Sequence, residues 1–459
     1  MISDYWHQPS DVWYQPSDYW CQQSDYWHQP SDYWYRQSDY WYQQNNKTIM
    51  VAQGYKQTEV GVIPDDWEVK TLGEIGNCFI GLTYSPIDVR ESGTLVLRSS
   101  NIQNNLLRFD DNVFVDCLIP EKLINQEKDI LICVRNGSRN LIGKCALIEG
   151  SAVGQTFGAF MSVYRSSFNS YIIHLFRSLI IKKQIDEHLG ATINQITNKS
   201  LNSFQIPIPP TLSEQTAIAT ALSDTDSLIS SLEGLIAKKR NIKQGAMTTL
   251  LSPKEGWEVK SIFQLADNKK ELFDDGDWIE AEHITDDGIR LIQTGNIGIG
   301  KYVEKGIKKY IYETSFYKLK CKPLIEGDLL ICRLADPAGR ACVLPDLKET
   351  KVITSVDITI FRPRKEVVNR VFLVNYFSTS KWFQQVIEKV GGTTHKRISR
   401  GSLAKIKISI PDLEEQTRIA TILSDMDNEI VALETKLEKY KQIKQGMMTN
   451  LLTGKIRLV

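Results

Sequence analysis

The sequence of 459 residues has no run of about 18 consecutive apolar residues, which is the length that a membrane-spanning helix requires. Its first residues also lack the basic and then apolar segments that are typical of a secretory signal peptide. We therefore expect a soluble protein of the cytoplasm. With 42% hydrophobic residues the chain can form sizeable cores, and its length suggests two to four domains.

Cysteines at metal-binding spacings are absent as well. The eight cysteines include no Cys-x-x-Cys pair, and no nearby histidine completes a zinc site. Cys133 and Cys332 each end a hydrophobic Leu-Ile-Cys run, which is typical of a buried strand. We therefore expect structural thiols and no bound metal.

The chain also lacks a complete catalytic or nucleotide-binding motif. Residues 295–302 approach a phosphate-binding loop, but Tyr302 replaces the hydroxyl residue that would contact magnesium. The Glu-x-Lys pairs at 68–70 and 258–260 resemble part of a nuclease centre, yet their repetition at two domain starts favours a structural role. An Asn-Pro-Pro-Tyr-like adenine methylation motif and a glycine-rich cofactor turn are both missing. We expect a chain that is not an enzyme by itself.

What the chain does contain is a long duplication. Residues 212–224 return about 201 residues later as residues 413–425, with Glu-Gln-Thr-x-Ile-Ala-Thr-x-Leu-Ser-Asp common to both. Residues 242–251 match residues 443–452 in the same way. A duplicated chain is a pseudo-twofold object, which suits a partner that offers two similar surfaces. Duplex DNA is the commonest such partner.

A β-rich stretch precedes each duplicated segment, and both stretches open with Trp-Glu-Val-Lys, at residues 67–70 and 257–260. Their strands correspond in order while their loops differ in length, and such loops usually carry specificity. The sequence predicts an α+β fold in which two β-rich recognition domains of α/β type are separated by two long antiparallel coiled-coil helices. The expected segments are a disordered tail (1–49), domains at 54–212 and 253–412, and helices at 213–252 and 413–459.

Apolar residues in both duplicated segments alternate at spacings of three and four, which is typical of a coiled-coil seam. The seam is weaker in the first segment, where Thr225 and Lys239 interrupt it. A helix of about 38 residues would form a rod about 57 Å long. The predicted seam residues are Leu222, Ile229, Leu232, Ile236, Leu423, Met426, Ile430, Leu433 and Leu437.

The tail repeats Ser-Asp-Tyr-Trp, once Ser-Asp-Val-Trp, every seven residues from Ser3 to Trp41. Adjacent aromatic residues and three prolines leave no separated seam, so we expect disorder. Six of the ten tryptophans lie here, and base stacking on them is one interpretation. A translated tandem repeat without a selected role is the favoured one, and Met50 is a possible alternative start.

The net charge is zero overall but is unevenly distributed. Residues 256–410 hold 26 Lys and Arg against 20 Asp and Glu, whereas residues 65–209 hold 14 against 15. The tail has a net charge of −4. The second domain therefore has the stronger electrostatic case for binding nucleic acid.

Polar and basic side chains follow corresponding strands in both domains. Arg, Asn and Gln are the side chains that form paired hydrogen bonds with guanine and adenine, and a basic cluster at residues 396–400 suits phosphate contact. For each residue taken singly, a solvated loop position is the alternative. The candidate DNA contacts are Arg98, Ser99, Asn101, Gln103, Arg135, Asn136, Ser138, Arg139, Gln293, Thr294, Asn296, Arg333, Arg340, Lys396, Arg397 and Arg400.

These segments together resemble the DNA specificity subunits of type I restriction-modification systems. The resemblance covers residues 54–459 and leaves the tail outside. It rests on the opening at Ile63–Trp67, the Ile-Pro to Glu-Gln transitions at Ile206–Gln215 and Ile408–Gln416, and the Lys-Gln-Gly-x-Met-x-x-Leu-Leu helix ends.

The resemblance implies two target recognition domains, each reading half of a split double-stranded DNA site. It implies helices that set the spacer and dock two modification subunits, which would bring S-adenosylmethionine and methylate adenine. Restriction subunits would supply translocation and cleavage driven by ATP with Mg²⁺, and this chain would bind no cofactor. Two alternatives stay open: a coiled-coil adaptor that does not touch DNA, and a self-contained DNA methyltransferase or nuclease.

Overall fold

The computed structural model describes residues 51–189, 194–334, 336–392 and 396–458, so the expected tail lies outside the described residues. Contacts divide the chain into two compact units. Among the described residues, one unit extends up to Gln215 and includes the residues from Leu451 onward, and the other extends from Thr216 to Asn450.

The first domain is built on two four-stranded sheets, with strand orders β11-β10-β13-β4 and β12-β6-β9-β5. All four residues of β10, the expected Leu-Ile-Cys strand, are buried, and Leu131 and Cys133 belong to the domain core. The elements of this domain are β1 (Tyr55–Thr58), β2 (Gly61–Pro64), β3 (Glu68–Thr71), α2 (Leu72–Ile75), β4 (Asn77–Ile80), β5 (Val89–Arg90), β6 (Thr94–Leu97), β7 (Ile102–Gln103), β8 (Leu106–Leu107), β9 (Phe114–Val115), β10 (Ile130–Cys133), β11 (Cys145–Leu147), β12 (Thr156–Phe157), β13 (Met161–Arg165), α3 (Asn169–Phe176), α4 (Leu179–His188), α5 (Asn198–Ser203) and β14 (Gln205–Ile208).

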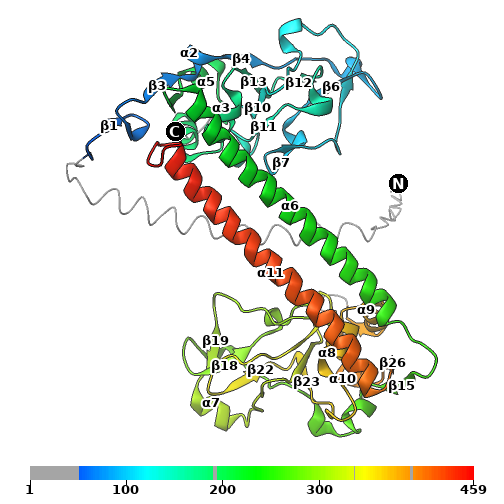
Figure 1. Cartoon of the computed structure of the whole chain (residues 1–459). Coiled ribbons are helices and arrows are strands. Elements are labelled where there is room, and N and C mark those ends of the chain that lie inside the picture. The colour runs from blue at the N-terminus through cyan, green and yellow to red at the C-terminus, as the bar shows by residue number, and fades with distance from the viewer. Residues whose placement is uncertain (1–50, 190–193, 335, 393–395, 459) are drawn as a thin grey trace, which may run out of the picture. The chain divides into compact units, whose positions relative to one another are not determined.

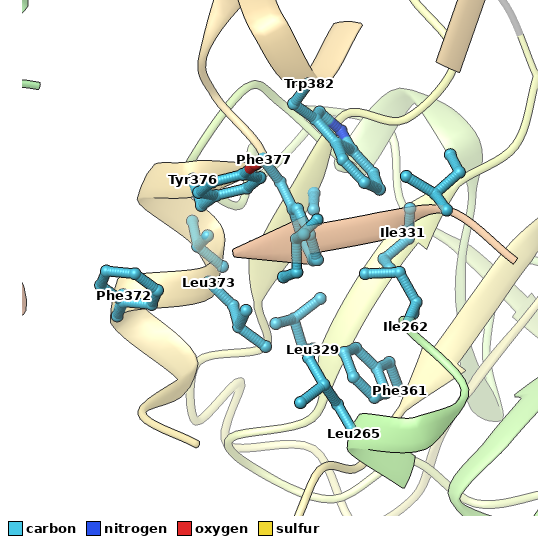
Figure 2. Packing of buried hydrophobic residues seen from close by; sticks show 14 of the residues in the cluster. Ile262, Leu265, Leu329, Ile331, Phe361, Phe372, Leu373, Tyr376, Phe377 and Trp382 are labelled. Carbon is cyan, nitrogen blue, oxygen red and sulfur yellow. The ribbon is translucent and has the colours of Figure 1, made fainter. Parts of the chain in front are cut away.

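The second domain repeats this plan, with strand orders β21-β20-β23-β16 and β22-β18-β19-β17. The duplication seen in the sequence therefore extends to the sheet topology. Figure 2 shows part of its core, where Trp382 and Phe377 lie near Ile331. Its elements are β15 (Glu258–Ser261), β16 (Phe273–Asp275), β17 (Ile284–Thr285), β18 (Ile289–Ile292), β19 (Lys309–Ile311), α7 (Glu313–Lys318), β20 (Leu329–Cys332), β21 (Ala341–Val343), β22 (Val352–Thr354), β23 (Ile358–Phe361), α8 (Arg370–Tyr376), α9 (Ser380–Ile387), β24 (Val390–Gly391), β25 (Arg397–Ile398), α10 (Arg400–Ala404) and β26 (Lys407–Ile410).

Two long helices complete the described chain, α6 (Leu212–Leu250) and α11 (Leu413–Leu451), each of 39 residues. They run side by side in opposite directions (Figure 1), because Asp226 pairs with Lys444 while Lys243 pairs with Asp427. Along the predicted seam Leu222, Leu232, Ile236, Leu423 and Ile430 are buried. The other four predicted seam residues are half-buried: Ile229, Met426, Leu433 and Leu437.

The ion pairs between the helices repeat the pseudo-twofold relation. Arg240–Glu434, at 2.6 Å, corresponds to Lys441–Glu233, at 2.8 Å. Such exposed pairs contribute little energy singly, but they favour one register and direction over others.

In the first unit the C-terminal residues pack on the opening of the first domain. Arg457 pairs with Asp66 at 2.9 Å and with the fully buried carboxylate of Glu214 at 2.5 Å. This contact lowers the pKa of Asp66, chiefly through the Arg457 hydrogen bond. Gly454 has φ of +67°, and a Cβ there would lie 2.5 Å from Pro64. The last residues therefore close the first domain and do not continue α11.

Replacing Arg457 by alanine is expected to lower the free energy of unfolding by about 2 kcal/mol, because the Glu214 carboxylate would be buried without a cationic partner. Chemical denaturation measures this change. The exposed Lys455→Ala variant is the control and should stay within about 0.5 kcal/mol of wild type. The Arg457→Ala effect should shrink in a Glu214→Gln background, and an equal loss in both backgrounds would contradict the assignment.

Candidate nucleic-acid interface

Three loops of the first domain, at residues 98–108, 134–142 and 194–197, converge into what we call the first loop cluster. The amide of Asn136 donates to the Ser99 hydroxyl at 3.2 Å, and the amide of Asn194 donates to the Gly137 carbonyl at 3.1 Å. The Ile196 N–H donates to the Val134 carbonyl at 2.8 Å. Residues that are distant in the sequence are thus held as one surface.

The second domain forms the equivalent second loop cluster from residues 293–305, 333–341 and 396–398. Arg340 joins its parts, because its guanidinium donates to the carbonyls of Ile297 at 2.7 Å and Thr294 at 3.1 Å. It also donates to the carbonyls of Leu334 at 3.1 Å and Pro337 at 3.0 Å. The 396–398 loop joins through the Ile398 N–H, which donates to the Arg333 carbonyl at 3.0 Å.

Replacing Arg340 by alanine is expected to cost about 1–3 kcal/mol of stability, because four loop carbonyls lose a charged donor. Arg340→Lys is the matched variant: it keeps the charge but cannot reach four carbonyls with its three donors. Denaturation of both variants, with Lys389→Ala as an exposed control, measures the effect. A lysine variant as stable as wild type would show that only the charge matters.

A buried asparagine shapes the same turn in each domain. The Asn101 side chain accepts from the Arg98 N–H at 2.9 Å and donates to the Arg108 carbonyl at 2.9 Å. Asn296 accepts from the Gln293 N–H at 3.0 Å and donates to the Val303 carbonyl at 2.9 Å. Both side chains are at most 2% exposed. They hold the loops and do not offer their amides to a base edge.

The structure therefore corrects several predicted contacts. Arg333 is 3% exposed and pairs with Asp275 at 3.1 Å. Burial lowers the pKa of Arg333 and raises that of Asp275. The Arg340 guanidinium donates its hydrogen bonds to backbone carbonyls. Four of the predicted contacts are therefore framework residues: Asn101, Asn296, Arg333 and Arg340. The sequence did not distinguish them, because Asn and Arg are used both to hold loops and to read DNA.

Two residues of the predicted phosphate cluster are engaged within the fold. Arg397 pairs with Asp357 at 3.2 Å, and Arg400 pairs with Asp274. Lys396 is exposed. A phosphate would have to compete with these carboxylates for Arg397 and Arg400, but not for Lys396.

The remaining predicted residues lie at the surface of the loop clusters. Gln103, Arg135, Ser138 and Arg139 are exposed. Arg98 is half-buried and pairs with Asp111 at 2.8 Å. The other candidates, Ser99, Asn136, Gln293 and Thr294, are half-buried. The loop clusters bring these residues together from separate parts of each domain.

Local charge in the loop clusters differs from the domain totals. The first loop cluster contains four arginines and no carboxylate, although its whole domain is slightly acidic. The second contains six basic and two acidic residues. Arg98, Arg333 and Arg397 are paired with carboxylates that lie outside these loops. The exposed positive charge that favours a phosphate backbone therefore comes from Arg135 and Arg139 on the first surface and from Lys301, Lys305 and Lys396 on the second.

Sequence reasoning missed Phe160, which is 58% exposed, with the Arg135 guanidinium 5.0 Å from its ring centre. An exposed aromatic ring beside an arginine suits stacking on a base or sugar. Its only signal in the sequence was a large apolar residue in the Gly-Ala-Phe turn before β13. Lys301 and Lys305 are also exposed on the second loop cluster, and the only sequence signal there was the incomplete phosphate-loop motif.

That motif forms a different structure. Ile297 forms a bridge with Tyr302, so residues 297–302 make a tight turn, and the next element is the strand β19 and not a helix. Within the described ranges, no three His, Cys, Asp or Glu side chains gather closely enough to hold a metal ion. None of the helices in the described part of the chain has the length and apolar character needed to cross a membrane.

Comparison with known proteins gives a match to one family across both domains. Residues 64–239 and 254–445 match the type I restriction modification DNA specificity domain. The chain is 26% identical over 429 residues to the MjaX type I restriction enzyme specificity subunit of Methanocaldococcus jannaschii, covering 88% of this chain and 97% of that protein. It is 22% identical over 428 residues to the EcoKI specificity subunit of Escherichia coli, covering 86% and 90%.

Solved structures give the same fold. A chain from a type I restriction-modification system, studied for complex assembly and conformational transition, has a TM-score of 0.54 at 17% identity and covers 86% of this chain and 99% of its own. The S subunit of a type I system from M. genitalium has a TM-score of 0.52 at 14% identity, covering 84% and 96%. At such identities the likeness shows the fold alone.

Proposed function

The chain belongs to the type I restriction-modification DNA specificity family, and from this premise we propose that each of its loop clusters reads one half of a bipartite DNA target. It acts as a specificity subunit and leaves the chemistry to partner subunits. No comparison supports an adaptor without DNA binding, or a self-contained methyltransferase or nuclease.

One observation carries the proposal. The two domains hold the same three loops on the same sheet order, but the exposed side chains differ: Gln103, Arg135 and Arg139 in the first loop cluster, Lys301, Lys305 and Lys396 in the second. A shared framework with different surface groups suits two similar but distinct half-sites.

The paired helices have two further roles in the proposal. Helix α6 is the covalent connection between the domains, and its 39 residues make a rod about 58 Å long. A rigid connection of this kind would fix the spacer between half-sites. Leu228, Leu235 and Ile242 follow one another every seven residues along α6 and are 37–47% exposed, which suits docking of modification subunits.

The partners would supply the cofactors. Modification subunits would bring S-adenosylmethionine and transfer its methyl group to adenine in each half-site. Restriction subunits would use ATP and Mg²⁺ for translocation and cleavage. We place the assembly in the cytoplasm, where DNA and these cofactors are available.

The test is single-molecule methylation sequencing of DNA from cells that express this chain with and without its modification partner. We expect a new bipartite methyladenine motif that requires both proteins. A soluble complex that produces no new motif would overturn the proposal. Methylation by the chain alone would instead favour the self-contained methyltransferase.

Replacing Arg135 by alanine is expected to weaken binding of the specific duplex by about 1–3 kcal/mol and to relax discrimination at one position of one half-site. The reason is that Arg135 is exposed on the first loop cluster beside Phe160. Affinity titrations at several salt concentrations measure the change. Lys183→Ala, at an exposed residue outside the cluster, is the control. A uniform loss on all sequences would assign Arg135 to the phosphate backbone.

A further inference from the structure

A buried arginine of the second domain holds one of the loops of the second loop cluster. Arg290, on the inner strand β18, is 1% exposed, and its guanidinium donates to the Glu304 carboxylate at 2.7 Å. It also donates to the Lys309 carbonyl at 3.3 Å and lies 5.6 Å from the centre of the Tyr310 ring. The loop that contains Glu304 is therefore tied to the centre of a sheet by an ion pair.

Glu304 in turn fixes the residues on both sides of it. Its carboxylate accepts from the Lys305 N–H at 3.1 Å and from the Tyr302 hydroxyl at 3.3 Å. The residue between Tyr302 and Glu304 is Val303, whose N–H donates to the backbone carbonyl of Asn296 at 2.9 Å. Its own carbonyl accepts from the Asn296 side chain, also at 2.9 Å. This backbone segment is thus held by the sheet on one side and by the asparagine turn on the other.

The Lys305 ammonium lies against that turn, at residues 294–296. A Cβ added to Gly295 would collide with the Lys305 Nζ, so the glycine provides the space in which the ammonium stands. The turn itself is held by Arg340, which donates to the Thr294 carbonyl at 3.1 Å. Lys305 is exposed and forms no ion pair with any residue that the structure describes. A cation without a carboxylate partner is therefore held at a defined place on the loop cluster.

The first domain shows that the fold itself does not need this arrangement. The two turns are in register, since Asn101 holds the Arg108 carbonyl as Asn296 holds the Val303 carbonyl. At the equivalent positions the first domain has Leu95 for Arg290, Ser100 for Gly295, Phe109 for Glu304 and Asp110 for Lys305. Replacing a buried ion pair by apolar residues is often neutral or stabilising. An ion pair that the equivalent domain lacks therefore points to a role in placing a side chain.

Fixed placement is what a base contact requires. A phosphate contact carries no sequence information, and a mobile lysine can make it. A lysine that reads a base must instead meet two acceptors of one guanine, O6 and N7, in the major groove. Groups that recognise a ligand in this way have to be held within about 0.5 Å of their working position. A lysine that is fixed by its own loop suits the guanine better than the phosphate.

We propose that Lys305 reads a guanine in the half-site of the second domain, and that Arg290 and Glu304 are its positioning residues. This inference rests on the proposed function, because it assigns one contact within that DNA-reading surface. The Lys305 ammonium donates to the guanine O6 and N7 atoms. Asp110, the equivalent residue of the first domain, cannot make this contact, since an ionised carboxylate only accepts hydrogen bonds. The two half-sites therefore differ at this position.

Methylation sequencing of cells that express the full chain with its modification partner tests the guanine contact. We expect Lys305→Ala to lower discrimination about tenfold at one G·C pair, in one half-site only. Gly295→Ala keeps every charge but occupies the space of the ammonium, so it should relax the same position at least about threefold. Lys301→Ala removes an exposed lysine of the same loop cluster that Glu304 does not hold, and it should weaken all sites equally. Relaxation in both half-sites, or in neither, would overturn the proposal.

The positioning residues are tested by Arg290→Leu/Glu304→Gln, which removes both charges and leaves no buried charge unpaired. This double variant should relax the same G·C pair as Lys305→Ala, and adding Lys305→Ala to it should cause no further loss, because both changes remove one contact. A further loss of full size would show that Lys305 acts without Arg290 and Glu304. Denaturation checks that the double variant folds, and if it does not, Gly295→Ala decides.

Duplex titrations with the complex of chain and modification partner separate a base contact from a phosphate contact. Lys305→Ala should weaken binding of the specific duplex about tenfold and change binding of a duplex without the motif far less. An equal loss on every sequence, with a shallower salt dependence, would place Lys305 on the phosphate backbone and overturn the proposal. If wild type gives no bipartite motif, the proposed function itself has failed. A wild-type motif that Lys305→Ala leaves unchanged overturns this inference alone.

Discussion

Lengthening α6 and α11 by one heptad each is expected to move the two half-sites apart by about three base pairs while leaving each half-site sequence unchanged. Seven helical residues add about 10 Å, and one base pair occupies about 3.4 Å. The original motif should lose its methylation, and a motif with the longer spacer should replace it. Methylation sequencing of both motifs in the same cells measures the exchange.

The insertions can be placed so that the helix pair keeps its register. Duplicating residues 230–236 after Ile236, and residues 431–437 after Leu437, repeats each helix's own heptad at the middle of the pair. The ion pairs Lys243–Asp427 and Asp226–Lys444 then shift together, as do Arg240–Glu434 and Glu233–Lys441. All seam positions also keep their spacing.

The control is the same insertion in α6 alone, which offsets the ion pairs and should give neither motif. A double insertion that still methylates the original motif would show that the helices do not set the spacer. A double insertion that gives no motif, in a protein that unfolds like wild type, would show that docking of the partner was lost.

The paired helices could be predicted from the sequence because their signals are local. Spacings of three and four mark the seam, and prolines precede the starts of α6 and α11. The second helical segment was expected to reach residue 459, but α11 is shorter and ends at Leu451. Arg457 instead contacts Glu214, which is 243 positions away in the sequence. No local pattern indicates such a contact.

In the loop clusters, the sequence predicted which segments come together but not which of their side chains are exposed. Comparing the two halves of the sequence identified the corresponding loops, because strands and turns recur in the same order. It could not tell which residues of one type hold the loops and which are exposed on the surface. Arg340 and Arg135 both follow a Leu-Ile-Cys strand, yet Arg340 holds four carbonyls and Arg135 is exposed. The distinction depends on which loops lie opposite, and this is a property of the folded chain.

The net charge of a whole domain does not predict the charge of one of its surfaces. Summed over the domain, residues 65–209 are slightly acidic, which weakened the case for DNA binding by the first domain. The fold separates these charges: Arg135 and Arg139 stand on the first loop cluster, while Asp129 is buried and paired with Arg165 at 2.6 Å. A domain total cannot describe a surface of three loops.

Replacing Trp382 by alanine is expected to lower the free energy of unfolding by about 3–5 kcal/mol. The Trp382 side chain is fully buried, and its ring stacks on Phe377 with 4.2 Å between ring centres (Figure 2). Its indole N–H donates to the Gly339 carbonyl at 2.8 Å. Truncation would leave both a cavity and a buried carbonyl without a donor.

This tryptophan connects the core with the surface that we propose reads DNA. Gly339 lies in the second loop cluster beside Arg340, has φ of +92°, and leaves no room for a side chain, since a Cβ would lie 2.9 Å from Val386. Trp382→Phe keeps most of the packing but removes the donor, so it should cost about 1–2 kcal/mol and selectively weaken the second half-site. Trp278→Ala, at a residue 66% exposed, is the control and should change stability by no more than about 0.5 kcal/mol. Denaturation and half-site methylation together separate the two effects: if Trp382→Phe loses neither, the indole contact does not position Gly339, and packing alone explains the burial of Trp382.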